Sequence, residues 1–243
     1  MVAASTPGHD GIVAATDEGV NWTCHHGADD SVTTPSVALL AVAAVFAVGD
    51  WTARWRGERR LEYLCKPATI LVLLVTAVVI MPAEDLGARR WWFVAALCFS
   101  LLGDVLLMVP SDRFVAGLGA FLLGHLCYLA GFFSHPPSAA ALGVAAGAVV
   151  VVLGPLTWRV LAALRGEGPL RVAVGLYILV IAAMCATAVA TGEVLAALGA
   201  VLFVSSDAMI AWNRFVKGLR HAEVAIMVTY HLAQAALVLS LVR

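Results

Sequence analysis

Two aspartates stand inside apolar runs that otherwise suit a hydrocarbon environment. Asp104 lies in "SLLGDVLLMV" (100–109), and Asp207 lies in "LFVSSDAMIAW" (202–212). A charged residue at the centre of a membrane helix costs about 2.5–3.5 kcal/mol, so it normally serves a function. Two neighbouring carboxyl groups can divide one proton between them. The pair therefore predicts proton-transfer chemistry. The alternative is a hydrogen-bond network that only ties the two helices together.

Other polar side chains fall in the same half of neighbouring apolar runs. Polar groups at membrane depth face a bundle interior or a wet cavity, so we expect one cavity toward the basic side. A structural role is the alternative for the tyrosines and histidines. Asp50 ends the first apolar run, where an ion pair with Arg54 competes with a functional role. The other predicted supporting residues are Ser100, His125, Tyr128, Tyr230, His231 and Gln234.

The composition is that of a polytopic membrane protein. Of 243 residues, 62% are hydrophobic and 13% are charged, and the mean hydropathy is +0.93. A soluble domain carries about 25% charged residues. The formal net charge of −1 gives no reason to expect a nucleic-acid partner. The five cysteines are scattered without a C-x-x-C pair, so no disulfide framework or zinc framework is predicted. Abundant Ala, Val, Gly and Arg point to a bacterial source.

Eight apolar runs are long enough to cross a membrane, since a crossing takes about 20 residues. We predict an all-α membrane domain over 35–243, with Pro67 in the first turn of the second helix. Segment 1–34 is polar and lacks both Lys and Arg. We therefore predict a disordered tail there and no signal peptide. The expected spans are 35–53, 67–83, 91–109, 114–133, 139–158, 170–191, 194–213 and 222–242.

The linkers predict the orientation. Twelve basic residues fall on one side of the predicted membrane and three on the other. The positive-inside rule then places the basic side in the cytoplasm and both termini outside. We expect a multi-pass protein of the bacterial inner membrane, with its cavity in the cytoplasmic half. Three of these basic residues would also lie at the level of a lipid phosphate, although their simplest role is to set the orientation in the membrane. They are Lys66, Arg113 and Arg214.

A weak internal repeat is also present. "GDVLLMVPSDRFVAGL" (103–118) resembles "SDAMIAWNRFVKGL" (206–219), with an aspartate followed by R-F-V-x-G-L in both. The two copies are about 100 residues apart and their helices cross in the same sense. This pattern predicts two parallel four-helix halves, with chance similarity of apolar sequence as the alternative.

Four motifs together resemble the YhhN family of membrane proteins, the lysoplasmalogenases. They are "SLLGDVLLM", "FVAGLGAFLLGHLCYLAGF", "LFVSSDAMIAWNRF" and "YHLAQAAL". The resemblance covers about residues 35–243. It implies hydrolysis of the vinyl ether bond of a lysoplasmalogen, a lysophospholipid, within membrane lipid. It also implies that Asp104 and Asp207 are the catalytic acids. Neither a cofactor nor a metal is expected, and no protein partner is indicated.

The implied chemistry suits two carboxyl groups. A vinyl ether is stable to base and is cleaved by protonation at carbon, which gives an oxocarbenium ion that water attacks. One aspartate would give the proton, and the other would stabilise the cation and accept a proton from water, as in glycosidases. The sequence leaves open which aspartate has which role. The basic residues Lys66, Arg113 and Arg214 would hold the phosphate.

Two other classes of function fit parts of the pattern. Paired acids, a basic face and a repeat also suit a proton-coupled exporter of a lipid or amphiphile. A zinc hydrolase could use Asp104, His125, Asp207 and His231 as ligands, although only two histidines lie at depth and no H-E-x-x-H is present. A serine hydrolase of the G-x-S-x-G type is disfavoured because that motif is absent.

Overall fold

The computed structural model describes residues 34–109 and 113–242, and this part of the chain is almost entirely helical. It contains eight α-helices that are long and apolar enough to cross a membrane, so the chain is a multi-pass membrane protein, as its composition predicts. A short 3₁₀ turn precedes α3. The helices are α1 (Thr34–Arg56), α2 (Arg59–Val79), α3 (Gly87–Met108), α4 (Phe114–Phe133), α5 (Ala139–Ala163), α6 (Gly168–Ala190), α7 (Val194–Phe215) and α8 (Ala222–Leu239).

The predicted N-terminal tail, 1–34, lies outside the described residues except for Thr34, with which α1 begins. The disorder predicted for that segment therefore stays a prediction. The other helices start and end within a few residues of the expected spans, apart from the start of α2 and the end of α5.

Helix α2 begins earlier than the hydropathy pattern predicts. We expected its first turn at Pro67, but α2 starts at Arg59, so Pro67 lies in its interior and the expectation was wrong. The added segment, "RRLEYLCK", consists mostly of residues that favour helices. Its polarity hides it from a search for apolar runs. Lys66 therefore lies within a membrane-spanning helix and not in a linker.

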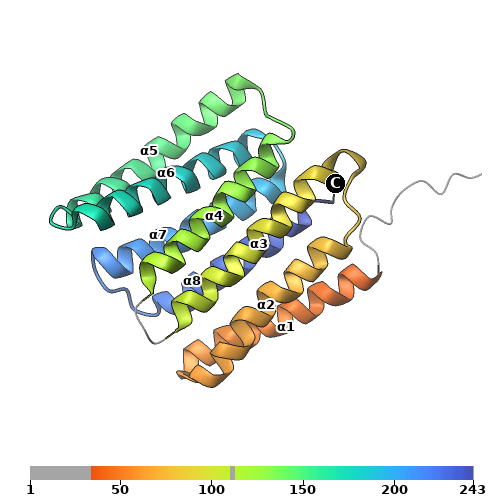
Figure 1. The fold of residues 1–243 in the computed structure, drawn as a ribbon, viewed down its shortest axis with the longest axis horizontal. Helices are drawn as coiled ribbons and strands as arrows, with labels where there is room; N and C mark the ends of the chain where they lie inside the picture. Colours follow the sequence, from red (N-terminus) through yellow and green to blue (C-terminus); the bar gives the residue numbers. More distant parts are fainter. Residues whose placement is uncertain (1–33, 110–112, 243) are drawn as a thin grey trace, which may run out of the picture.

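The helices form a bundle that is two layers deep at its centre (Figure 1). Helices α3 and α4 lie in front of α7 and α8, with α1 and α2 at one edge and α5 and α6 at the other. Consecutive helices run antiparallel. As a result, the ends of α3 and α7 and the starts of α2, α4 and α8 gather at the same end of the bundle.

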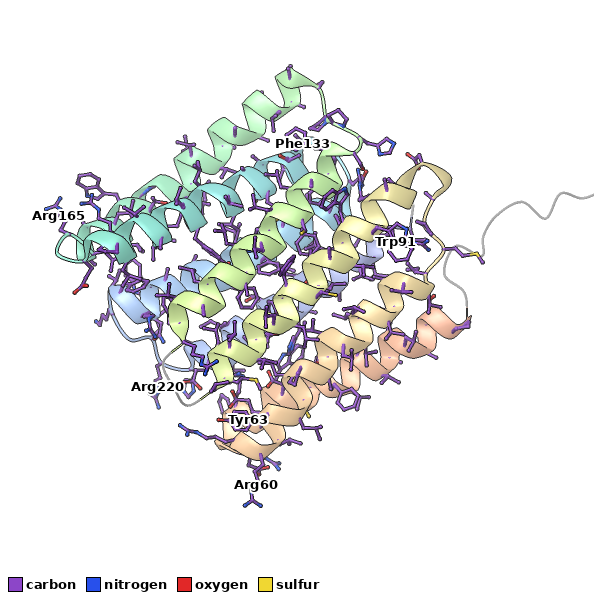
Figure 2. The ribbon with its side chains drawn as sticks, viewed as in Figure 1. Arg60, Tyr63, Trp91, Phe133, Arg165 and Arg220 are labelled. Atoms are coloured by element: carbon purple, nitrogen blue, oxygen red, sulfur yellow. The ribbon has the colours of Figure 1, made fainter. Side chains whose placement is uncertain are left out.

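The two ends of the bundle differ in chemistry (Figure 2). Arg60, Arg165 and Arg220 project at one end, whereas Trp91 and Phe133 lie at the other. This separation follows from the positions of the basic linkers along the sequence. The side of the membrane that each end faces remains a prediction from those charges.

A row of glycines on α4 brings that helix close to α3. Gly117, Gly124 and Gly131 recur every seven residues and face α3. A Cβ atom added at Gly131 would lie 2.8 Å from the Phe93 ring, and one at Gly124 would lie 3.3 Å from the Ala96 carbonyl oxygen. Small residues permit such close backbone approach between membrane helices. The three glycines therefore mark the face of α4 that packs against α3.

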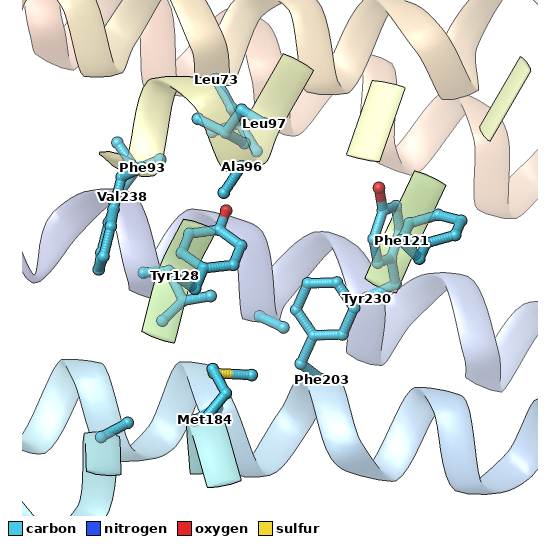
Figure 3. Close-up of a cluster of buried hydrophobic side chains, with 14 of the residues drawn as sticks. Leu73, Phe93, Ala96, Leu97, Phe121, Tyr128, Met184, Phe203, Tyr230 and Val238 are labelled. Atoms are coloured by element: carbon cyan, nitrogen blue, oxygen red, sulfur yellow. The ribbon is translucent and has the colours of Figure 1, made fainter. Parts of the chain in front are cut away.

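The core is aromatic where these two layers meet (Figure 3). Tyr128 of α4, Phe203 of α7 and Tyr230 of α8 are fully or almost fully buried there. Phe203 packs edge-on against Tyr230 with ring centroids 5.4 Å apart, and against His125 at 4.6 Å. These buried rings pack around the polar side chains that the sequence singles out.

Candidate functional site

Asp207 belongs to a three-residue cluster contributed by three helices. The Tyr177 hydroxyl of α6 donates to Asp207 Oδ2 of α7 over 2.5 Å. His125 Nε2 of α4 lies 3.0 Å from that hydroxyl and 3.3 Å from the same carboxylate oxygen. Because the Tyr177 hydroxyl gives its single proton to Asp207, His125 Nε2 is the donor toward both oxygens. The cluster fixes the Asp207 carboxyl group from two sides.

Two members of this cluster lie in the wall of an apolar cavity of about 80 Å³ that is bounded by α4, α5, α6, α7 and the end of α3. Asp207 and Tyr177 both line it, and Asp207 is 13% exposed. Nearly all of the other lining side chains are hydrocarbon, among them Leu118, Phe121, Leu153, Leu156, Val160, Ile178, Ile181 and Val204. The cavity thus combines a carboxyl group with a lining that suits an aliphatic chain.

Asp104 has different surroundings. Lys66 Nζ of α2 lies 3.0 Å from Asp104 Oδ1, and the Tyr230 hydroxyl of α8 donates to Asp104 Oδ2 over 2.9 Å. The side chains of Lys66 and Asp104 are 5% and 1% exposed. An ammonium and a carboxylate at membrane depth each need an opposite charge, and each supplies it for the other. Asp104 is not among the residues that line the apolar cavity.

The role predicted for Lys66 is therefore corrected. We expected Lys66 in a cytoplasmic linker, available to a lipid phosphate. It is instead buried in α2, and its ammonium group is paired with Asp104. The sequence alone does not reveal the pairing of Lys66 with Asp104, because the two residues lie on different helices that come together only in the folded bundle.

The two aspartates occupy separate clusters with aromatic side chains between them. Tyr230, the partner of Asp104, packs against Phe121 and Phe203 with ring centroids 5.9 and 5.4 Å apart. Phe203 in turn packs against His125 of the other cluster. Among the described residues no hydrogen bond joins the two carboxyl groups. The polar groups expected to share one cavity are thus divided between a cavity wall and a closed core.

The remaining predicted polar residues of α8 have partners within the core. The Trp51 indole N–H donates to His231 Nδ1 over 3.1 Å, and the Tyr128 hydroxyl donates to Gln234 Oε1 over 2.5 Å. Trp51 was not predicted as a site residue. These bonds join α1 and α4 to α8, which is the structural alternative considered for Tyr128 and His231.

Asp50, Ser100 and Arg113 lie away from the apolar cavity. Asp50 pairs with Arg54 over 3.3 Å, which is the ion pair that the sequence offers as the alternative to a functional role. Ser100 is buried on α3, and its Oγ lies 3.4 Å from the position a Cβ atom would take at Gly124. Arg113 is exposed at the start of α4.

Arg214 lies at the end of α7. Its guanidinium carbon is 3.8 Å from the centroid of the Phe114 ring. Phe114 also packs edge-on against Phe215 at 5.8 Å, so the two R-F-V-x-G-L segments meet in space. The internal repeat that those segments indicate remains a prediction.

Tyr177 is the main residue that the sequence interpretation missed. It stands alone in the apolar run of α6, "VAVGLYILVIAAM", where a single tyrosine is ordinarily a packing residue. Only its contacts with Asp207 and His125 distinguish it.

As for a metal site, residues 34–109 and 113–242 contain no group of three His, Cys, Asp or Glu side chains arranged to hold an ion.

Comparison with known proteins gives a family and named relatives. Residues 61–241 match the model of the YhhN family. A lysoplasmalogenase of Mycobacterium tuberculosis is 35% identical over 175 residues, which cover 69% of this chain and 65% of the relative. Lysoplasmalogenase TMEM86B of Homo sapiens is 31% identical over 189 residues, which cover 78% of this chain and 80% of the relative.

A membrane protein of Escherichia coli described as uncharacterized YhhN is 39% identical over 83 residues, covering 34% of this chain and 38% of the relative. The alignment with the mycobacterial relatives spans 65% of their length. No solved structure matches the chain significantly.

Proposed function

The chain belongs to the YhhN family, and we propose that it is a hydrolase of the lysoplasmalogenase type. The proposed reaction cleaves the vinyl ether bond of a lysoplasmalogen to a fatty aldehyde and glycerophosphoethanolamine or glycerophosphocholine. Relatives that carry the name lysoplasmalogenase support this reaction, and their names do not favour the alternative of a proton-coupled exporter.

The observation that carries the proposal is the position of Asp207. It is a carboxyl group in the wall of an otherwise apolar cavity, held by Tyr177 and His125. A vinyl ether with its first chain carbons in that cavity would present its double bond to Asp207. Water exclusion by the surrounding hydrocarbon strengthens electrostatic interactions with a developing cation.

Protonated Asp207 would give its proton to the β-carbon of the vinyl ether, and the electron pair of the C=C bond would form the new C–H bond. The resulting oxocarbenium ion would be stabilised by the Asp207 carboxylate. Water would then add to the cationic carbon and return a proton to Asp207. The hemiacetal would collapse by breaking the bond to glycerol, its hydroxyl proton passing to the leaving oxygen, to give aldehyde and alcohol.

Tyr177 and His125 would act as positioning residues for Asp207. Both contact the same oxygen, Oδ2, which leaves Oδ1 to face the substrate. Side chains locked by such hydrogen bonds hold a reacting group in a productive geometry.

Asp104 would have a structural role in this scheme. Its two oxygens already contact Lys66 and Tyr230, and it lies in the closed core. We therefore propose Asp207 as the proton donor, because Asp207 lines a cavity whereas Asp104 does not.

The direct test is aldehyde release by the purified protein in detergent, from 1-alkenyl-glycerophosphoethanolamine, its 1-acyl counterpart and a diacyl lipid. We expect aldehyde from the alkenyl substrate alone. Asp207→Asn should lower kcat by about 10²–10⁴-fold, the usual contribution of a general acid. Asp85→Asn is the matched control, because Asp85 is exposed and lies just before the start of α3, at the end of the bundle away from the basic linkers. Wild-type turnover by Asp207→Asn would contradict the mechanism.

We also propose that the end of the bundle that carries Arg60, Arg165 and Arg220 faces the bacterial cytoplasm and that both termini lie outside. The support is the excess of basic linkers at that end. Asp207 would then act in the inner half of the membrane.

A further inference from the structure

A groove lies between α5 and α6, the two helices at one edge of the bundle (Figure 1). Its volume of about 540 Å³ is within the range of about 300–1,000 Å³ that is usual for ligand pockets. Along α5 its lining extends from Val149 to Ala162, a length of about 20 Å. Gly154 and Gly175 are in the wall, and a Cβ atom added at Gly154 would meet nothing within 4 Å.

The groove is apolar along most of its length and basic at one end. Its lining includes Arg165, just after the end of α5, and Arg171, in the first part of α6. Both side chains are exposed, and Arg165 projects at the basic end of the bundle (Figure 2). The Arg165 guanidinium lies 5.7 Å from the centroid of the Trp158 ring. Within the described part of the chain, neither arginine forms a salt bridge.

The start of α6 adds to the attraction for an anion. Arg171 is the fourth residue of α6, and the first turn of this helix contains no acidic residue. A cation near a helix N-terminus opposes the helix dipole, whereas an anion there is stabilised by it. Glu167 is exposed just before α6 but does not line the groove. A basic end joined to an apolar channel matches the phosphate and the hydrocarbon chain of a phospholipid.

The groove adjoins the cavity that Asp207 lines. Leu153 and Thr157 of α5 and Ile178 of α6 belong to the walls of both. These three side chains therefore separate a groove at the edge of the bundle from the carboxyl group inside it.

The groove also places a phospholipid at the depth of Asp207. Arg171 and Tyr177, which is bonded to Asp207, are six residues apart on α6, a rise of about 9 Å. In a lysoplasmalogen, seven bonds join phosphorus to the carbon to be protonated. Extended, they span about 8 Å, if three bonds cover about 3.5 Å as in an extended polypeptide. A lipid with its phosphate at Arg171 thus needs a sideways movement to reach Asp207.

Helix α5 is the helix best suited to permit that movement. Among the eight described helices it is the least buried, with only Ala145 and Val160 in the interior. Pro155 lies inside it, next to the shared wall, and removes one backbone hydrogen bond there. Segments with few buried apolar contacts open at low free-energy cost.

We propose that the α5–α6 groove is the lateral entry site for a lysophospholipid from the membrane, with the phosphate bound by Arg165 and Arg171 and the chain along the groove. The lipid then passes between α5 and α6, as the side chains of Leu153, Thr157 and Ile178 move aside, and its ether end enters the cavity. The destination, Asp207, rests on the proposed function; binding in the groove does not.

The first test measures binding of lipids that cannot be hydrolysed. The probes are 1-O-alkyl-glycerophosphoethanolamine and 1-O-alkylglycerol, titrated into the purified protein. The double variant Arg165→Gln with Arg171→Gln should weaken binding of the phosphate probe by about 10-fold or more, since both charges next to the phosphate are lost. Binding of 1-O-alkylglycerol should stay unchanged. Arg220→Gln, exposed at the same end and outside the groove, is the matched control.

The second test blocks the groove. Gly154→Leu places a side chain in open space in its wall and should weaken binding of both probes by about 10-fold or more, the scale of a steric change in an apolar pocket. Gly147→Leu is the matched control. It lies two helical turns earlier on α5, is equally open to an added Cβ atom and does not line the groove.

The third test measures aldehyde release from 1-alkenyl-glycerophosphoethanolamine. The double arginine variant should raise KM and keep the wild-type kcat, because the surroundings of Asp207 are unchanged. Gly154→Leu should lower kcat/KM, and Gly147→Leu should not. A thermal unfolding curve like that of the wild type shows that each variant is folded.

The outcomes separate the entry site from the proposed reaction. Binding that needs the two arginines, without aldehyde from any alkenyl lipid, would overturn the reaction and support the lipid site. Aldehyde release with wild-type kcat/KM in both the arginine variant and Gly154→Leu would overturn the entry site and leave the reaction standing. Equal displacement of the phosphate probe by diacyl phosphatidylglycerol would also overturn it, because the groove would then hold bulk membrane lipid.

Discussion

At the scale of single residues, the two aspartates have opposite kinds of neighbour. Asp104 is bound by an ammonium group in a closed core, and Asp207 is bound by neutral hydrogen-bonding groups at a cavity wall. The first arrangement holds helices together, and the second leaves a carboxyl oxygen for a ligand. Similar sequence surroundings have thus produced two different sites.

Removal of one partner of the buried ion pair should destabilise the protein. Lys66→Met leaves the Asp104 carboxylate buried without its countercharge, and such a change costs about 3–5 kcal/mol. Thermal unfolding of the purified protein measures this loss. The double variant Lys66→Met with Asp104→Leu should recover most of the stability, because both charges are gone. Equal unfolding temperatures for the wild type and Lys66→Met would show that the pair does not stabilise the fold.

Loss of the Tyr177 hydroxyl should affect turnover more than binding. Tyr177→Phe keeps the ring and removes the hydrogen bond to Asp207. We expect kcat to fall by about 10-fold or more with KM little changed, since a hydrogen bond to a charged group is worth about 1.5–3 kcal/mol. Aldehyde-release kinetics provide both constants. Tyr63→Phe, at an exposed position on α2, is the matched control, and a similar kcat for both variants would argue against a positioning role.

At the scale of helices, the α3–α4 contact fixes where His125 and Asp104 lie. The glycines of α4 allow this contact, but they are not equivalent. Gly131 faces the Phe93 ring, whereas Gly119 has no neighbouring atoms within 4 Å of an added Cβ. Alanine substitutions at these two glycines can therefore separate the energetic cost of overpacking from the gain in helix propensity.

Gly131→Ala should lower the stability of the bundle. The new methyl group would lie 2.8 Å from the buried Phe93 ring, and overpacking of this kind costs about 1–3 kcal/mol. Gly119→Ala should be neutral or stabilising, because alanine favours helices by up to about 1 kcal/mol over glycine. Thermal unfolding of the two variants compares them directly, and equal stabilities would contradict the close packing of α3 on α4.

The sequence predicted the helices well because hydropathy reports the length of chain that lipid surrounds. It missed the first two turns of α2 because "RRLEYLCK" is polar and lies at the end of the bundle. Lys66 was misplaced for the same reason. Tyr177 was missed because a lone tyrosine in an apolar run carries no pattern, and its role depends on α4 and α7 meeting α6.

At the scale of the whole molecule, most of the basic residues are concentrated at one end of the bundle. Arg60 and Arg220 mark this end, and the linker that contains His135 joins α4 to α5 at the other. The orientation of the protein therefore decides which face of the membrane a lipid headgroup would occupy while bound.

The orientation is testable with a thiol reagent that does not cross membranes. Arg220→Cys should be labelled in inverted membrane vesicles and protected in intact cells, because the positive-inside rule places it in the cytoplasm. His135→Cys should show the reverse pattern. The unsubstituted protein, with its native cysteines, gives the background. Labelling of Arg220→Cys in intact cells would reverse the proposed topology.

The small size of the apolar cavity bears on the lipids that such an enzyme would accept. A volume of about 80 Å³ is roughly half that of an apolar cavity of about 150 Å³ that holds one benzene molecule. Only the few carbons nearest the ether bond would therefore fit inside, and the rest of the chain would stay outside. The protein would then be nearly indifferent to chain length. The products would follow the lipid composition of the host membrane, with selectivity concentrated at the polar end of the substrate.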